Sequence, residues 1–279
     1  MLALAASEPA LRAAEMIALG IVASFVGSIV GLGGGFIAIP ALRLLFHLPP
    51  SLTAGTSLVL VTANVASASV EYWRQGRIDK PLGFLMGVLA IPGSILGALA
   101  LRFVGSSGFD LAYAAILGIF ALDLARRGIN EKRSAPSWLP WSRPRHFHDP
   151  IAAMDYEYAQ STPVAAVAGL LNGFLSSFFG IGGGVLAVPL LLRVFVLPAH
   201  IVSGTSHLII LLSAPFGVLA HVFSGDVDWL LAVPLAFGGI LGGRFGAQTA
   251  KRLSTPALAR VLAAVLFIAA GSLVLQHLV

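Results

Sequence analysis

The feature that most constrains this chain is a glycine-rich segment that occurs twice within strongly apolar sequence. Residues 31–60 and 180–209 are identical at 13 of 30 positions, at a fixed offset of 149 residues. The first segment begins GLGGG and the second begins GIGGG, and each later reaches a Gly-Thr-Ser triplet. A match of this length indicates an internal duplication in which each half forms one unit of the same fold.

The composition places both segments in a membrane. The 279 residues are 57% hydrophobic and only 10% charged, and the mean hydropathy is +0.92, which lies outside the range of soluble domains. A helix needs about 20 apolar residues to cross a bilayer core of about 30 Å. Shorter apolar pieces, 35–48 and 184–197, follow the glycine clusters. The expected spans are roughly 14–31, 51–73, 82–104, 109–125, 163–180, 200–223, 229–249 and 256–276. We therefore expect an all-α integral membrane protein.

The duplication divides the chain into three parts. Residues 1–125 form the first transmembrane repeat, and residues 162–279 form the second. Between them, residues 126–161 are rich in arginine and proline and form a polar linker. Its tryptophans, Trp138 and Trp141, favour a position along the lipid headgroups, where indole rings prefer to lie.

The distribution of basic residues predicts how the two repeats face. If each glycine-broken segment enters the membrane and returns, as a re-entrant segment or short hairpin, each repeat adds three transmembrane helices and the repeats are inverted. Arg12, Arg43 and Arg102 then lie on one side, and the other 14 of the 17 basic residues lie opposite. If each broken segment crosses once, the split is 10 to 7. Because basic loops stay in the cytoplasm, inverted-topology repeats with a cytoplasmic linker are favoured.

The glycine clusters predict breaks in membrane helices. Adjacent glycines let the chain unwind without Cβ clashes, and the helix that restarts exposes free N–H groups at the positive end of its dipole. Such an end binds anions, and paired breaks in two repeats point to a transport site at the membrane midplane. The alternative is that the glycines only allow helices to pack closely. A dinucleotide-binding loop is excluded, because Phe36 stands where G-x-G-x-x-G requires glycine.

The combined motifs resemble the TauE/SafE family of sulfite and organosulfonate exporters. The matching features are the doubled G-[LI]-G-G-G-x-[IL]-x-[IV]-P-x-L pattern, the G-T-S triplets, and the G-x-[IV]-D motifs that end at Asp79 and Asp228. The resemblance covers nearly the whole chain outside the linker. It implies a multi-pass secondary transporter of the bacterial plasma (inner) membrane that exports small sulfur-containing anions such as sulfite or sulfoacetate.

Other functions compete with this reading. One alternative is a permease or channel for another small anion, such as thiosulfate or a small carboxylate. The sequence contains no G-x-S-x-G elbow, so we expect no enzyme activity and no cofactor. It has no cysteine, which removes thiolate metal sites, and we expect no metal site. The net charge of +5 is typical of cytoplasmic loops in a membrane protein, so we expect no nucleic-acid partner. No ATP-binding motif occurs. Flux is then driven by a coupled ion, H+ or Na+, or by the gradient of the substrate.

The expected substrate-binding groups are donors for the three oxygens of a sulfite or sulfonate. Hydroxyl groups of serine and threonine otherwise bond back to their own helix. Buried amides and a lone histidine otherwise hold helices together. The candidates are the backbone of Gly33, Gly34, Gly35, Gly182, Gly183 and Gly184, the hydroxyls of Thr56, Ser57, Thr205 and Ser206, and the side chains of Asn64, Asn172 and His207.

Two arginines lie close to the ends of the short apolar pieces. Arg43 and Arg193 are expected either to attract anions to an entrance or to extend to the membrane surface. Asp123 precedes Arg126 and Arg127 by about one helical turn, which is typical of a solvated ion pair.

Overall fold

The structure is a computed structural model that describes residues 2–127, 139–151 and 153–253, together with residues 264, 267 and 271. Seven of its helices are long and apolar enough to cross a membrane, which confirms the expected helical membrane protein. The predicted span 256–276 lies almost entirely outside the described residues.

In chain order the elements are α1 (Leu2–Val30), α2 (Gly35–Leu44), α3 (Pro50–Arg74), α4 (Lys80–Ala100), a 3-10 turn (Leu101–Phe103), α5 (Ser106–Arg127), β1 (Ser142–Asp149), β2 (Met154–Ser161), α6 (Thr162–Phe179), α7 (Gly184–Arg193), α8 (Ala199–Phe223) and α9 (Trp229–Ala250).

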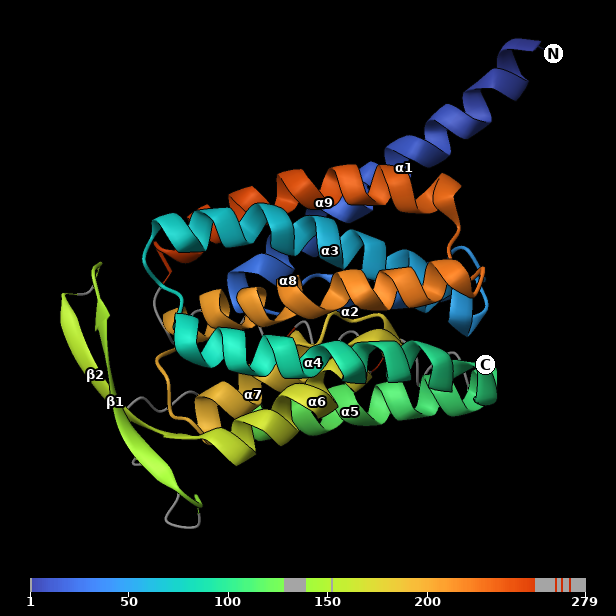
Figure 1. The fold of residues 1–279 in the computed structure, drawn as a ribbon. Coiled ribbons are helices and arrows are strands. Elements are labelled where there is room, and N and C mark those ends of the chain that lie inside the picture. The colour runs from blue at the N-terminus through green and yellow to red at the C-terminus, as the bar shows by residue number, and fades with distance from the viewer. Residues whose placement is uncertain are drawn as a thin grey trace.

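The linker departs from the all-α expectation. Its strands β1 and β2 pair antiparallel, with Ser142 opposite Ser161 and Asp149 opposite Met154, and the hairpin lies at one end of the helices (Figure 1). Trp141 is 83% exposed in the structure, and Trp138 lies outside the described residues. The strands escaped prediction because the arginines and prolines of the linker pointed to irregular structure. Strand β2 does carry an alternating signal, with Met154, Tyr156 and Tyr158 on one face.

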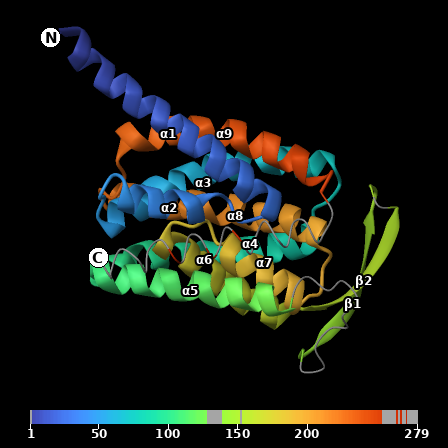
Figure 2. The same ribbon diagram turned by 180° about the vertical axis from the view of Figure 1, so that it is seen from behind.

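Both predicted helix breaks are present. Helix α1 ends at Val30 and α2 begins at Gly35, while α6 ends at Phe179 and α7 begins at Gly184. Three glycines of each cluster have φ between 74° and 90°, a left-handed conformation that residues with a Cβ rarely adopt. The two short helices therefore start inside the protein and turn back along the helices that precede them (Figure 2).

Helices from different halves pack most closely against each other. The closest pairs are α1 with α9 and α4 with α6. A Cβ built on Gly238 would lie 2.2 Å from the Ile17 carbonyl oxygen, and one on Gly246 would lie 2.3 Å from that of Phe25. Because both contacts advance along α1 and α9 together, these helices are parallel. Glycine thus brings the two halves into backbone contact.

The helix directions follow a regular scheme. Helices α1, α3 and α9 run toward the end that carries the hairpin, and α4, α6 and α8 run away from it (Figure 1). Helices α1, α3 and α4 therefore run opposite to α6, α8 and α9, their described counterparts 149 or 145 residues later.

Candidate functional site

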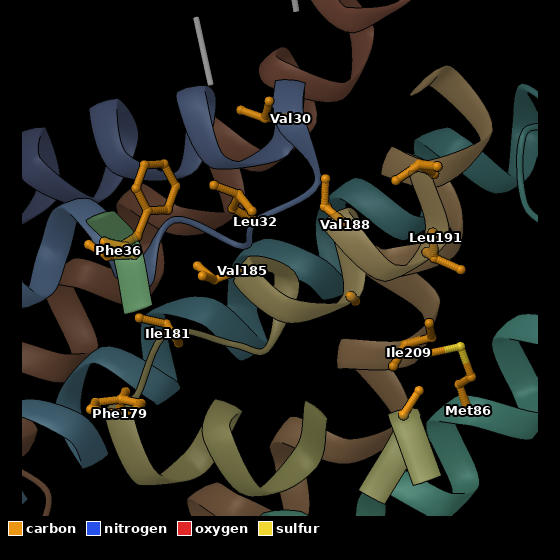
Figure 3. Close-up of a cluster of buried hydrophobic side chains, with 14 of the residues drawn as sticks. Val30, Leu32, Phe36, Met86, Phe179, Ile181, Val185, Val188, Leu191 and Ile209 are labelled. Carbon is orange, nitrogen blue, oxygen red and sulfur yellow. The ribbon is translucent and has the colours of Figure 1, made fainter. Parts of the chain in front are cut away.

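The two glycine clusters meet where the helices break. A Cβ built on Gly35 would lie 2.5 Å from the carbonyl oxygen of Gly180, and one on Gly184 would lie 2.4 Å from that of Gly31. Each cluster thus touches the other with its first and last glycines. Leu32 and Ile181, inside the clusters, are each 1% exposed and lie among the apolar side chains of α2 and α7 (Figure 3).

The starts of α2 and α7 leave backbone donors without helical partners. The Gly34 carbonyl accepts from Ile37 and Ala38, and the Gly183 carbonyl accepts from Leu186 and Ala187. The N–H groups of Gly33 to Gly35 and of Gly182 to Gly184 have no backbone acceptor within the described ranges. Two buried helix N-termini with their positive dipole ends therefore lie side by side.

The serines of the Gly-Thr-Ser triplets connect the halves. Ser57 Oγ donates to the carbonyl oxygen of Gly180 at 2.9 Å, and Ser206 Oγ donates to that of Gly31 at 2.7 Å. Each serine therefore holds the first glycine of the opposite cluster. These contacts are related by the same offset of 149 residues that relates the sequences.

The threonines make a second pair of contacts across the halves. Thr56 Oγ1 accepts from the backbone N–H of Asp228 at 3.0 Å, and Thr205 Oγ1 accepts from that of Asp79 at 3.0 Å. The same aspartates cap α9 and α4, because their carboxylates accept from N–H groups in the first turn. The G-x-[IV]-D motif is thus a helix cap that docks on the triplet of the other half.

The four triplet hydroxyls therefore already have protein partners. Sequence reasoning proposed them as substrate ligands or as bonds to their own helices, and the contacts across the halves were not foreseen. In the present conformation, Thr56, Ser57, Thr205 and Ser206 hold the halves together at the glycine clusters.

Asn64 belongs to a buried polar group that surrounds the end of α1. Ser28 Oγ donates to Asn64 Oδ1 at 2.6 Å, and the Tyr72 hydroxyl donates to the Ser28 carbonyl at 2.7 Å. His207 lies beside Tyr72, with 5.2 Å between ring centroids, and its Nδ1 lies 2.7 Å from the Ser203 carbonyl oxygen. His207 Nε2 and Asn64 Nδ2 have no partner within the described residues.

Asn172 lies against the second cluster. It is fully buried in α6, and neither its Oδ1 nor its Nδ2 has a hydrogen-bond partner in the described part of the chain. A Cβ built on Gly183 would lie 2.6 Å from Asn172 Nδ2, so the amide covers the residue before α7. Ser176, one turn later on α6, is also fully buried with an unpaired hydroxyl.

Sequence reasoning missed the partners of Tyr72 and His221. The offset of 149 relates these residues, and it also relates Ser28 to Ser177. Tyr72 bonds the Ser28 carbonyl, and His221 Nε2 lies 3.0 Å from the Ser177 carbonyl oxygen. The offset of 149 was the signal that could have related these residues. Because Tyr72 and His221 are different residue types, a count of identical positions does not include them.

Both arginines of the short helices pair with α5. Arg43 Nε donates to Asp110 Oδ1 at 3.0 Å, and Arg193 Nε donates to Asp123 Oδ2 at 3.1 Å. Arg43 is buried and also donates to the Leu48 carbonyl, so its guanidinium is held by protein groups. Asp110 and Asp123 lie toward opposite ends of α5, which therefore ties down both short helices.

The β-hairpin is fixed to the loop between α3 and α4. Arg77 Nη2 lies 3.3 Å from Asp149 Oδ2, and the Tyr158 hydroxyl donates to Asp79 Oδ2. Burial and the neighbouring Asp79 carboxylate raise the pKa of Tyr158 above its ordinary value. Since the Asp79 N–H is bonded to Thr205, the hairpin is linked through one residue to α8.

Comparison with known proteins places the chain among membrane transporters. The profile of the family described as sulfite exporter TauE/SafE matches residues 16–273. The chain is 29% identical over 272 residues to the probable membrane transporter protein YunE of Bacillus subtilis (strain 168), covering 94% of this chain and 97% of YunE. It is 27% identical over 234 residues to the probable membrane transporter protein YdhB of the same strain, covering 84% and 86%.

A third relative matches over a shorter part of the chain. The probable membrane transporter protein MJ0441 of Methanocaldococcus jannaschii is 26% identical over 182 residues, covering 63% of this chain and 60% of that protein. No solved structure matches the chain. The profile match spans most of the chain and both glycine clusters, and this protein belongs to the TauE/SafE family of membrane transporters.

Proposed function

We propose that the protein is a secondary transporter that exports small sulfur-containing anions, such as sulfite or sulfoacetate, across the bacterial plasma membrane. The observation that carries the proposal is the meeting of two buried helix N-termini, at Gly35 and Gly184, inside a multi-pass membrane protein. Free N–H groups at such ends suit an anion, because they supply donors and positive potential without a buried cation.

The substrate class rests on the description of the family, which names sulfite export. A sulfite or sulfonate group presents three acceptor oxygens, and the cluster glycines 33–35 and 182–184 offer several donors close together. We assign the anion to these backbone groups. The hydroxyls of the Gly-Thr-Ser triplets hold the clusters in place, because each is already bonded to the opposite half.

We further propose that the halves are inverted-topology repeats and that the linker is cytoplasmic. The opposite directions of α3 and α8, and of α4 and α9, support the inversion (Figure 1). The arginine-rich linker supports the orientation. Inverted halves supply inward-open and outward-open states by exchanging their roles, with the substrate at the interface between them. Movement at this interface would open the contacts that Ser57 and Ser206 make.

Reconstituted flux tests the proposal. Proteoliposomes loaded with unlabelled sulfite are placed in radiolabelled sulfite, and the same experiment is repeated with sulfoacetate, thiosulfate and acetate. A transporter gives saturable uptake that is accelerated by unlabelled substrate on the opposite side, whereas a channel gives no such acceleration. Imposed H+ and Na+ gradients identify the coupling ion. Uptake equal to that of protein-free liposomes for all four anions would refute the proposed function.

A further inference from the structure

The two glycine clusters differ in the residues that face them, and the difference concerns the helix that precedes each break. Asn172 of α6 corresponds to Ala23 of α1 at the offset of 149, and Ser176 corresponds to Gly27. The second half therefore presents an amide and a hydroxyl where the first half presents a methyl group and a hydrogen atom.

In the first half, α1 itself covers the start of α2. A Cβ built on Gly27 would lie 2.2 Å from the backbone N of Gly34 and 2.5 Å from its Cα. No group can enter between them. Ser24, which also has a buried and unpaired hydroxyl in the described structure, is directed elsewhere, since its Oγ lies 3.4 Å from a Cβ built on Gly239 of α9.

In the second half, the corresponding space holds polar side chains that lack partners. Asn172 and Ser176 are fully buried, one helical turn apart on α6, and all three of their polar atoms are unpaired among the residues described. The Asn172 amide lies against Gly183, immediately before α7. Unpaired polar atoms in a membrane interior cost free energy. The hydrogen-bond partner of such a group is therefore expected to be a bound molecule that is not part of the protein.

We infer that the anion site is asymmetric: one oxyanion binds at the N-terminus of α7, held by Asn172, Ser176 and the free N–H groups of Gly183 and Gly184, and the N-terminus of α2 binds none. This inference rests on the proposed function and assigns its substrate site to one half. Asn172 Nδ2 and the Ser176 hydroxyl donate to the oxygens of the anion, and the backbone N–H groups supply the remaining donors. One anion binds per chain.

The test is equilibrium binding of radiolabelled sulfite and sulfoacetate to the purified full-length protein in detergent, with thermal unfolding in parallel. Asn172→Leu keeps the volume of the side chain and removes both polar atoms, and Ser176→Ala removes one atom. Asn172→Leu is expected to raise the Kd at least tenfold, and Ser176→Ala severalfold, because hydrogen bonds to a charged group are lost. Neither is expected to lower the melting temperature, since neither removes a bond within the protein.

Ser213→Ala is the matched control. Ser213 is a fully buried serine of α8 whose hydroxyl bonds to its own helix, at the Ile209 carbonyl, so its loss should leave the Kd unchanged. Saturable binding by the unmodified protein, with both α6 variants binding equally well, would overturn the asymmetric site and leave the proposed function standing. Absence of anion binding by the unmodified protein would overturn both. Two anions bound per chain would overturn the asymmetry alone. If Asn172→Leu does not fold, Ser176→Ala decides.

Discussion

Ser206 of α8 donates a hydrogen bond to the carbonyl oxygen of Gly31, 175 residues earlier in the chain, with 2.7 Å between the two atoms. Ser57 makes the equivalent bond to Gly180 at 2.9 Å. The two bonds join the halves where their membrane helices are interrupted. A helix break normally leaves backbone groups without partners, and here two buried carbonyls accept hydrogen bonds from the opposite half.

Removal of either serine hydroxyl should destabilise the protein by a similar amount. Ser57→Ala and Ser206→Ala each leave a buried carbonyl without this donor, at a cost of about 1 to 3 kcal/mol. Thermal unfolding in detergent measures the change, and Ser213→Ala, whose hydroxyl bonds within its own helix, should shift the melting temperature much less. Unchanged stability together with weakened anion binding would instead identify Ser57 and Ser206 as ligands.

A methyl group at the crossing of the clusters should separate them. Gly184→Ala places a Cβ 2.4 Å from the Gly31 carbonyl oxygen, and the contact can be relieved only by moving the backbone. Overpacking of this kind costs about 1 to 3 kcal/mol, and we expect flux to be lost as well. Gly118→Ala in α5 is the control, because no atom lies within 4 Å of its added Cβ. Equal flux and stability in both variants would contradict close contact between the clusters.

The buried ion pair of α2 should matter more than the partly buried one of α7. Asp110→Ala leaves Arg43 buried without its carboxylate, which costs about 3 to 5 kcal/mol. Asp123→Ala should cost about 0 to 1 kcal/mol, because the Arg193 and Asp123 side chains are 16% and 31% exposed to solvent. Chemical or thermal unfolding of the two variants compares them directly. A larger loss of unfolding free energy for Asp123→Ala than for Asp110→Ala would contradict the greater importance of the Arg43–Asp110 pair.

The inversion of the halves can be tested by labelling. The sequence has no cysteine, so single cysteines introduced at exposed equivalent positions report their side of the membrane. Arg74→Cys and Phe223→Cys end α3 and α8 at the same offset of 149. A membrane-impermeant maleimide added to intact cells should label Phe223→Cys only, and labelling of Arg74→Cys should require inside-out vesicles. Labelling of both from one side would refute the inversion.

The hairpin should loosen when Tyr158 loses its hydroxyl or its proton. Because the pKa of Tyr158 is raised in the folded protein, its stabilising contribution is complete below the unfolded value of 10.0 and declines as the pH rises above it. Wild-type melting temperature should therefore fall above about pH 10 partly through this group. Tyr158→Phe should lose that part of the pH dependence and expose the hairpin to protease near neutral pH. Identical pH profiles for the two proteins would contradict this role.

Most of the helical plan could be read from the sequence. The apolar runs predicted the seven described spans, and the glycines of each cluster predicted the breaks after Val30 and Phe179. Both predictions worked because hydropathy and backbone freedom depend on residues that are adjacent in the sequence. The β-hairpin was missed because the arginines and prolines of the linker outweighed the short alternating signal of β2. It is held by Arg77 and Asp79, which lie in a different loop.

The site was predicted in its elements and not in its contacts. The sequence alone determined that two glycine-broken helices occur 149 residues apart in a membrane protein, because hydropathy and backbone freedom are properties of neighbouring residues. Only the tertiary structure decided that Ser57 and Ser206 bond to the opposite cluster, and that the Asn172 amide lies beside Gly183 without a partner among the described residues. Hydrogen-bond partners depend on which segments cross in space, and a repeat in sequence does not specify how its two copies face each other.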